Sequence, residues 1–151
     1  MNRLLTVMLL LLIAAPAFAQ QWACQPTRPD ADGPYYKKDA PVRNSVGEGF
    51  LLFGEVKSAA DCNAIAQAKI EVWMAGPAGR YLDRWRATLY ADKVGRYWYK
   101  TDFPGNYGSR PPHIHIIANA PGYLELVTQY YPKQGTGEAQ FDLILIPETT
   151  K

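Results

Sequence analysis

The sequence contains few of the residues that most often bind metals or perform catalysis. Among 151 residues there are only two histidines and two cysteines. There is no long run of like charge, no low-complexity tract and no internal repeat, and the formal net charge is only +2. A chain so balanced in charge gives no reason to expect nucleic acid or an acidic surface as its partner.

The chain also lacks an apolar run long enough to span a membrane. Its longest one, residues 4–15, is shorter than the roughly 20 residues that a spanning helix needs. Arg3 precedes this run, and Ala17-Phe18-Ala19 follows it as a small-x-small cleavage site. This pattern predicts a signal peptide over residues 1–19 and a periplasmic or secreted protein without a membrane anchor. The remaining 132 residues suffice for one domain.

Cys24 and Cys62 form an isolated pair in a chain that we expect to be exported. In an oxidising compartment such a pair predicts a disulfide. The alternative is a metal site that combines cysteine and histidine, although neither cysteine lies near the histidines in the sequence.

After the signal peptide, residues 20–48 are rich in Pro, Asp and Gly and predict an arm that either lies on the domain or is mobile. The rest, residues 49–151, contains seven short apolar runs separated by turn sequences: 50–57, 69–74, 84–91, 96–101, 113–120, 123–131 and 141–146. This spacing predicts an all-β sandwich or barrel. Residues 59–68 are the one weak helix candidate.

The only two histidines lie in the stretch "NYGSRPPHIHIIA", residues 106–118. In a strand, His113 and His115 would point to the same face. Two hydrogen-bonded histidines on a half-buried face would also satisfy this pattern, so the pair alone does not establish a metal site.

The order of motifs around these histidines resembles the intradiol ring-cleavage dioxygenases, the family of catechol 1,2-dioxygenase and protocatechuate 3,4-dioxygenase. "AGRY" ends at Tyr81, "PGNY" ends at Tyr107, and "RPPHIH" follows as the most specific piece. The resemblance extends from "GPYY" at 33–36 to "FDLIL" at 141–145. It implies an all-β sandwich of the intradiol dioxygenase or transthyretin-like type, with little helix.

In that family two tyrosines and two histidines hold a non-haem ferric ion, and the resemblance places them at Tyr81, Tyr107, His113 and His115. Phenolate is a hard anionic donor, and a tyrosine with its usual pKa near 10 would ionise on such a cation. Tyr97 and Tyr99 lie nearby but do not match the family pattern.

Two other metals are compatible with parts of this pattern. A ferrous oxygenase uses two histidines and a carboxylate, which Asp83 or Asp102 could supply in an extradiol-type enzyme. Zinc is the second alternative, but a zinc site would not make use of the two phenolate ligands. A rival from another class is a non-catalytic transthyretin-like binding domain with a structural or vestigial metal site.

The resemblance implies a reaction in which O2 cleaves a catechol-type ring between its two hydroxylated carbons, giving a cis,cis-muconate-type diacid. It assigns Arg110 to electrostatic stabilisation of the substrate and Tyr107 to proton transfer, and Pro34, Tyr35 and Gln129 to the substrate pocket. The helical dimerisation segment of catechol 1,2-dioxygenases is absent, and only two residues separate Tyr107 from Arg110. Both departures predict a small exported member of the family with an open site.

Overall fold

The computed structural model describes residues 21–148, and these form eight strands and no helix. The strands are β1 (Phe50–Ser58), β2 (Lys69–Ala75), β3 (Tyr81–Tyr90), β4 (Arg96–Thr101), β5 (Ile114–Asn119), β6 (Leu126–Tyr130), β7 (Glu138–Gln140) and β8 (Leu143–Leu145). Among the described residues there is thus no helix with the length and apolarity to cross a bilayer. The predicted signal peptide lies outside the described residues.

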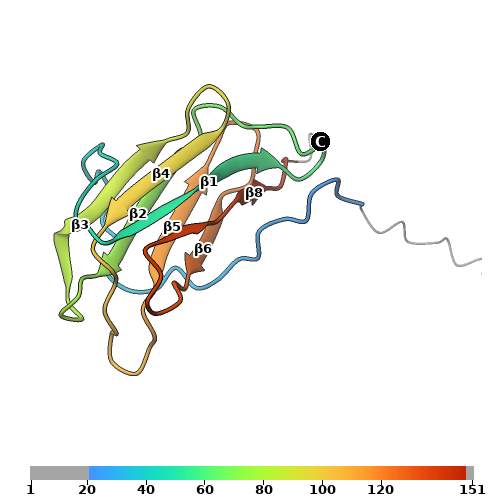
Figure 1. Cartoon of the computed structure of the whole chain (residues 1–151). Helices are drawn as coiled ribbons and strands as arrows, with labels where there is room; N and C mark the ends of the chain where they lie inside the picture. Colours follow the sequence, from blue (N-terminus) through green and yellow to red (C-terminus); the bar gives the residue numbers. More distant parts are fainter. Residues whose placement is uncertain (1–20, 149–151) are drawn as a thin grey trace, which may run out of the picture.

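The strands form two four-stranded sheets that lie face to face (Figure 1). One has the order β4-β1-β7, with β8 also paired to β1, and the other has the order β3-β2-β5-β6. In β1 buried residues alternate with half-buried ones, as expected for a strand with one face on the core. The predicted all-β sandwich is confirmed.

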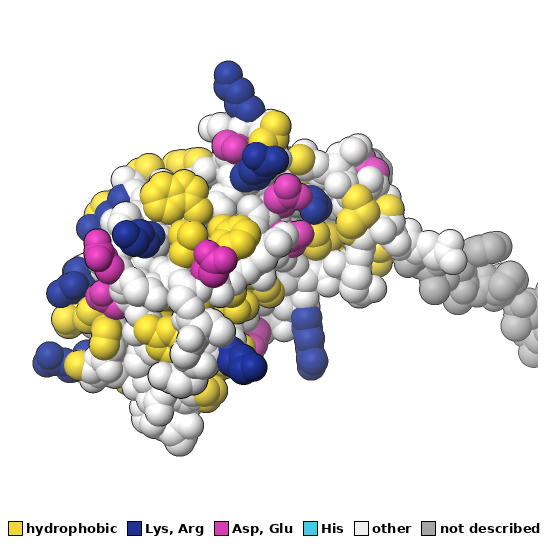
Figure 2. Space-filling view, viewed as in Figure 1, with side chains coloured by type: hydrophobic (Ala, Val, Ile, Leu, Met, Phe, Trp, Pro, Cys, Tyr) yellow, Lys and Arg dark blue, Asp and Glu magenta, His cyan; other side chains and the backbone are white. Residues whose placement is uncertain are grey.

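The β3-β2-β5-β6 sheet is covered on both of its faces. Strand β5 has five consecutive buried residues, because Ile114 and Ile116 face the core between the sheets while the alternate residues, His115 and Ile117, face the other way. This second, outer face is where both histidines are found. The face of the molecule in Figure 2 shows scattered apolar, basic and acidic groups, and no histidine is visible on it.

The N-terminal arm, residues 21–48, lies on the domain. In Figure 1 it runs past β6 and across to β3. The amide of Asp30 donates to the carbonyl of Val127 in β6 (3.0 Å), and the amide of Arg43 donates to the carbonyl of Thr88 in β3 (3.1 Å). The disulfide between Cys24 and Cys62 joins the start of the arm to the loop after β1, with a Cα–Cα distance of 5.3 Å.

The weak helix candidate at residues 59–68 does not form a helix. Cys62 and Gln67 have φ values of 61° and 58°, in the left-handed region that a right-handed helix cannot accommodate. The segment instead makes turns that bring Cys62 to its disulfide partner.

Of the expected strand over residues 141–146, only Leu143–Leu145 forms a strand, β8, and the additional strand β7 (Glu138–Gln140) precedes this range. Phe141 still donates its amide to the carbonyl of Phe53 (2.8 Å). At the next residue the Asp142 carboxylate, not a strand carbonyl, accepts the amide of Glu55 (3.0 Å). The side chain therefore interrupts the ladder, and β7 and β8 pair with β1 separately.

Candidate active site

The predicted ligands come from three neighbouring segments at one end of the β3-β2-β5-β6 sheet. His115 lies in β5, and His113 lies just before that strand. Tyr81 is the first residue of β3, which begins three residues earlier than the sequence pattern indicated. A register shift between Trp73 and Ala75 of β2 accompanies this start and pairs Tyr81 with Ala75.

Three side-chain atoms converge at this end of the sheet. The Tyr81 hydroxyl lies 2.8 Å from Nε2 of His115 and 3.2 Å from Nε2 of His113, and the two Nε2 atoms are 3.1 Å apart. Both histidines are almost fully buried. The structure thus brings three of the four predicted ligands into direct contact.

The hydrogen-bonding roles of these atoms are compatible with a cation between them. Nδ1 of His113 lies 2.7 Å from the carbonyl of Pro111 and must donate to it, so its Nε2 carries a lone pair. Nδ1 of His115 is buried and has no hydrogen-bond partner among the described residues. Two ligand atoms that each lie about 2.1 Å from one metal ion, with a right angle at the metal, are roughly 3 Å apart. The donor set therefore fits a metal ion.

Burial keeps all three side chains neutral in the protein alone. It lowers the pKa of His115 to about 3, with a further contribution from neighbouring His113, and it also lowers the pKa of His113. Burial raises the pKa of Tyr81 to about 12, against an opposing effect of Arg110. A trivalent cation would reverse the preference of Tyr81, because it stabilises the phenolate.

Residues of β2 and the arm hold His115 in place. Trp73 stacks on its ring with centroids 4.7 Å apart and planes within 7°, and the Trp73 indole N–H donates to the carbonyl of Pro34 (3.1 Å). A Cβ at Gly33 would lie 2.2 Å from Cε1 of His115. Neither Trp73 nor Gly33 was predicted as a site residue, although the alternation in "KIEVWM" places Trp73 on one face with Glu71.

The fourth predicted ligand, Tyr107, lies beside the three converging atoms. Its ring centroid is 5.1 Å from that of Tyr81. Its hydroxyl, however, is 2.7 Å from the hydroxyl of Tyr35, an exposed arm residue with φ of 69°. The Tyr35 ring also lies 4.8 Å from that of Tyr81. The predicted pocket residue Tyr35 thus touches both tyrosines.

A tight turn joins Tyr107 to Arg110. The two residues exchange backbone hydrogen bonds (3.3 and 3.0 Å), and Gly108 adopts φ of 58° between them. Residues paired in this way project their side chains to the same side. The short separation noted in the sequence is therefore a two-residue hairpin that places Arg110 next to Tyr107.

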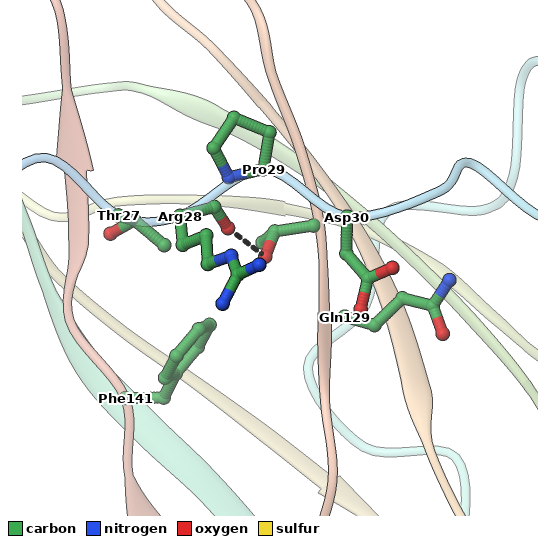
Figure 3. Close-up of a pocket in the computed structure, with 7 residues that line it drawn as sticks. Thr27, Arg28, Pro29, Asp30, Gln129 and Phe141 are labelled. Atoms are coloured by element: carbon green, nitrogen blue, oxygen red, sulfur yellow. Dashed lines mark hydrogen bonds between the residues drawn. The ribbon is translucent and has the colours of Figure 1, made fainter.

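Arg110 and Gln129, both predicted to contact substrate, are bonded to each other. Nη2 of Arg110 donates to Oε1 of Gln129 (2.8 Å) and to the hydroxyl of Tyr131 (2.8 Å). Beside them lies a cavity of about 430 Å³ lined by Thr27, Arg28, Pro29, Asp30, Thr128, Gln129 and Phe141 (Figure 3).

The residues that could have supplied other ligands lie elsewhere. Asp102 accepts the Trp85 indole N–H (2.8 Å), and Asp83 pairs with Lys37 (2.6 Å) and Arg86 (3.1 Å). Within residues 21–148 no three side chains of His, Cys, Asp or Glu cluster around a common point. A ferrous site with one of these aspartates is thus not assembled. Tyr97 and Tyr99 are buried in the core.

Known proteins with similar sequences include chlorocatechol, catechol and hydroxyquinol 1,2-dioxygenases. The chain is 29% identical over 141 residues to chlorocatechol 1,2-dioxygenase of Cupriavidus pinatubonensis, covering 71% of this chain and 55% of that protein. It is 31% identical over 127 residues to catechol 1,2-dioxygenase of Pseudomonas sp. (strain EST1001), covering 67% and 41%. No family model matches the chain. The chain spans about half the length of the curated relatives it matches.

Solved structures share the fold. The dioxygenase domain of a dioxygenase–carbohydrate-binding protein fusion from Streptomyces sp. SirexAA-E superposes with a TM-score of 0.73 at 28% identity, covering 82% of this chain and 100% of that one. An intradiol ring-cleavage dioxygenase from Tetranychus urticae gives a TM-score of 0.75 at 17% identity, with coverages of 82% and 96%. This second likeness concerns the fold alone.

Proposed function

We propose that this chain, like the dioxygenases whose sequences it resembles, cleaves a catechol-type ring between the hydroxylated carbons with O2. One observation carries the proposal. The hydroxyl of Tyr81 and the two Nε2 atoms of His113 and His115 lie 2.8–3.2 Å from one another, with Tyr107 alongside. The product of such a reaction is a cis,cis-muconate-type diacid.

In this proposal Tyr81, Tyr107, His113 and His115 hold a non-haem ferric ion. Two phenolates and two neutral imidazoles suit a hard trivalent ion, and the low pKa values that burial gives both histidines keep them available as ligands. When bound, Fe(III) would act as a Lewis acid that activates the catecholate ring toward O2.

Tyr107 is the residue placed to move a proton. Its hydroxyl is more accessible than the buried histidines and is already bonded to the hydroxyl of Tyr35. As a phenolate it could accept a proton from a substrate hydroxyl, which is general-base catalysis. Tyr35 would hold the resulting Tyr107 hydroxyl in place.

Arg110, next to Tyr107, provides a positive charge at the site. Its guanidinium lies close enough to oppose the burial-driven rise in the pKa of Tyr81 and to add to the lowering of the pKa of His115. A cation fixed there would stabilise the negative charge that develops on the ring and on reduced oxygen. Gly33 and Pro34 of the arm cover His115 and exclude water from the other side.

The test combines iron analysis, visible absorption and oxygen uptake on the purified protein. We expect one iron per chain, a red-brown phenolate-to-iron absorption band, and catechol-dependent O2 uptake with one O2 consumed per ring opened. His113→Ala and His115→Ala should each lose iron, colour and activity. Tyr81→Phe should shift or bleach the absorption band. Tyr90→Phe, at the exposed far end of β3, is its matched control and should leave the band unchanged. An iron-loaded, coloured protein that consumed no O2 with any catechol would support the non-catalytic binding domain instead.

A further inference from the structure

The Arg110 guanidinium is held at one nitrogen only. Nη2 has two hydrogens, and these go to Oε1 of Gln129 and to the Tyr131 hydroxyl, each at 2.8 Å. Among the described residues no acceptor is bonded to Nε or Nη1 of Arg110. These two nitrogens are thus free to face a substrate, and their direction depends on the two acceptors at Nη2.

Both acceptors are tied to the N-terminal arm. The Gln129 amide N–H₂ donates to the carbonyl of Ala31, which turns Oε1 toward Arg110. The Tyr131 hydroxyl lies 3.0 Å from Oδ2 of Asp30 and 3.0 Å from Oε1 of Gln129. A phenol has one proton to donate, and a carboxylate is the stronger acceptor. The Tyr131 proton therefore points to Asp30.

The Asp30 carboxylate is itself fixed. Its Oδ1 accepts the amide of Ala31 at 2.7 Å, which leaves Oδ2 for Tyr131. Figure 3 shows the Asp30 side chain next to Gln129, while the side chain of Arg28 extends toward Phe141. A chain of hydrogen bonds therefore runs from the arm carboxylate through the Tyr131 hydroxyl to the guanidinium.

We propose that Asp30, acting through the hydroxyl of Tyr131, is a positioning residue for the Arg110 guanidinium. An arginine side chain loses rotamer freedom when it is fixed, and Tyr131 is partly exposed. Without the carboxylate, neither the Tyr131 hydroxyl nor the arginine would have a fixed orientation. The proposal rests on the proposed function, because Arg110 needs positioning only if it acts on a bound substrate.

The first measurement needs no activity. Phenylglyoxal modifies accessible guanidinium groups, and peptide mass analysis reports the rate at Arg110 in the iron-free protein. We expect Tyr131→Phe and Asp30→Ala to speed this modification, because each removes a partner in the chain. Asp30→Asn, which keeps an acceptor oxygen, should restore most of the protection. Asp39→Asn, an exposed arm carboxylate outside the site, is the control and should match the wild type.

The second measurement separates positioning from a general structural effect. With iron content unchanged, Asp30→Ala and Tyr131→Phe should lower kcat for catechol by about tenfold with little change in KM. In the Arg110→Ala background, Asp30→Ala should add no further loss, because its effect passes through Arg110.

Unchanged Arg110 modification in Asp30→Ala and Tyr131→Phe would overturn the proposal. So would an equal loss of kcat with and without Arg110, since that would make Asp30 a structural residue of the arm. If iron-loaded wild type opened no catechol ring, the proposed function would fail and Asp30 would have no substrate-directed role, whereas the modification rates would still report whether the hydrogen-bond chain exists.

Discussion

Gly33 shows how closely the arm approaches the candidate ligands. It adopts φ of 71°, and a Cβ there would lie 2.2 Å from Cε1 and 2.9 Å from Nδ1 of His115. An added methyl group must displace either the arm or the imidazole ring, which is also stacked on Trp73.

We expect Gly33→Ala to lower iron affinity by about 10–100-fold, the usual effect of disturbing the support of a ligand. Gly122→Ala is the control, because Gly122 has φ of 81° with no atom within 4 Å of an added Cβ. Both variants should lose about 1 kcal/mol of stability from backbone strain, and Gly33→Ala should lose more because of the overlap with His115. Only Gly33→Ala should lose iron affinity. Iron titration followed by absorption checks this, and equal iron binding by the two variants would show that the close contact does not matter.

Tyr35→Phe removes the hydroxyl that is bonded to Tyr107 while keeping the ring. We expect iron to stay bound, the phenolate-to-iron band to shift and kcat to fall by about 10-fold or more, because the Tyr107 hydroxyl loses its partner. Tyr36→Phe is the matched control, since the Tyr36 hydroxyl donates to Glu71 instead (3.1 Å). Wild-type kcat in Tyr35→Phe would remove this hydrogen bond from the mechanism.

The sequence could predict some of these residues and not others. A period of two places His113 and His115 on one face without further information, and the family resemblance adds Tyr81, Tyr107 and Arg110. Gly33 and Asp30 act on residues 82 and 101 positions further along the chain. No local pattern in the sequence indicates such contacts, because they depend on where the arm crosses the sheet.

At the scale of elements, Asp102 at the end of β4 ties the two sheets to the arm. Its carboxylate accepts the Trp85 indole N–H from β3 (2.8 Å) and the amide of Glu48 from the arm (3.1 Å). The hydrogen bond from Trp85, followed by that from Glu48, holds the pKa of Asp102 below its usual range in spite of partial burial.

A carboxyl group with a depressed pKa stabilises the folded protein above its unfolded pKa of about 3.9, and this contribution disappears as the pH falls through the folded pKa. We therefore expect Asp102→Asn to lower the free energy of unfolding at pH 7 by about 1–3 kcal/mol and to approach the wild type below pH ~4. Urea unfolding at several pH values measures this, with Asp39→Asn as the control. Iron content should not change, and its loss would revive Asp102 as a metal ligand.

The boundaries of the elements were predicted well where alternation is strong and poorly where a side chain competes with the backbone. Strand β1 begins at Phe50 as its alternation indicates. The Asp142 carboxylate takes the place of a strand carbonyl and divides β7 from β8. The helix candidate failed because Cys62 and Gln67 adopt left-handed backbone angles. Neither effect has a signature in apolar periodicity.

For the whole molecule, the Cys24–Cys62 disulfide closes a loop with a sequence separation of 38 residues. The chain-entropy model gives about 4 kcal/mol for a loop of this length. We expect reduction, or the double variant Cys24→Ala/Cys62→Ala, to lower the free energy of unfolding by about 2–4 kcal/mol. Urea unfolding with and without dithiothreitol checks this, and dithiothreitol should have no effect on the double variant. Two alkylatable thiols in protein isolated from the periplasm would contradict the disulfide.

The outer-face position of the candidate site separates access to it from the integrity of the fold. The hydrophobic core lies between the sheets, whereas His115 is covered from outside by an arm whose backbone is bonded to β6 at Asp30 and to β3 at Arg43. A segment anchored at both ends can lift in its middle while the sheets stay intact, so local opening needs less free energy than global unfolding. Amide hydrogens of residues 32–36, for which the arm makes no backbone N–H hydrogen bond to the sheet, should therefore exchange with solvent well before those of β2 and β5. If the proposed function holds, the entry of a catechol into the site would depend on the rate at which this short span opens. Mutations in the core could then change the melting temperature without changing that opening rate.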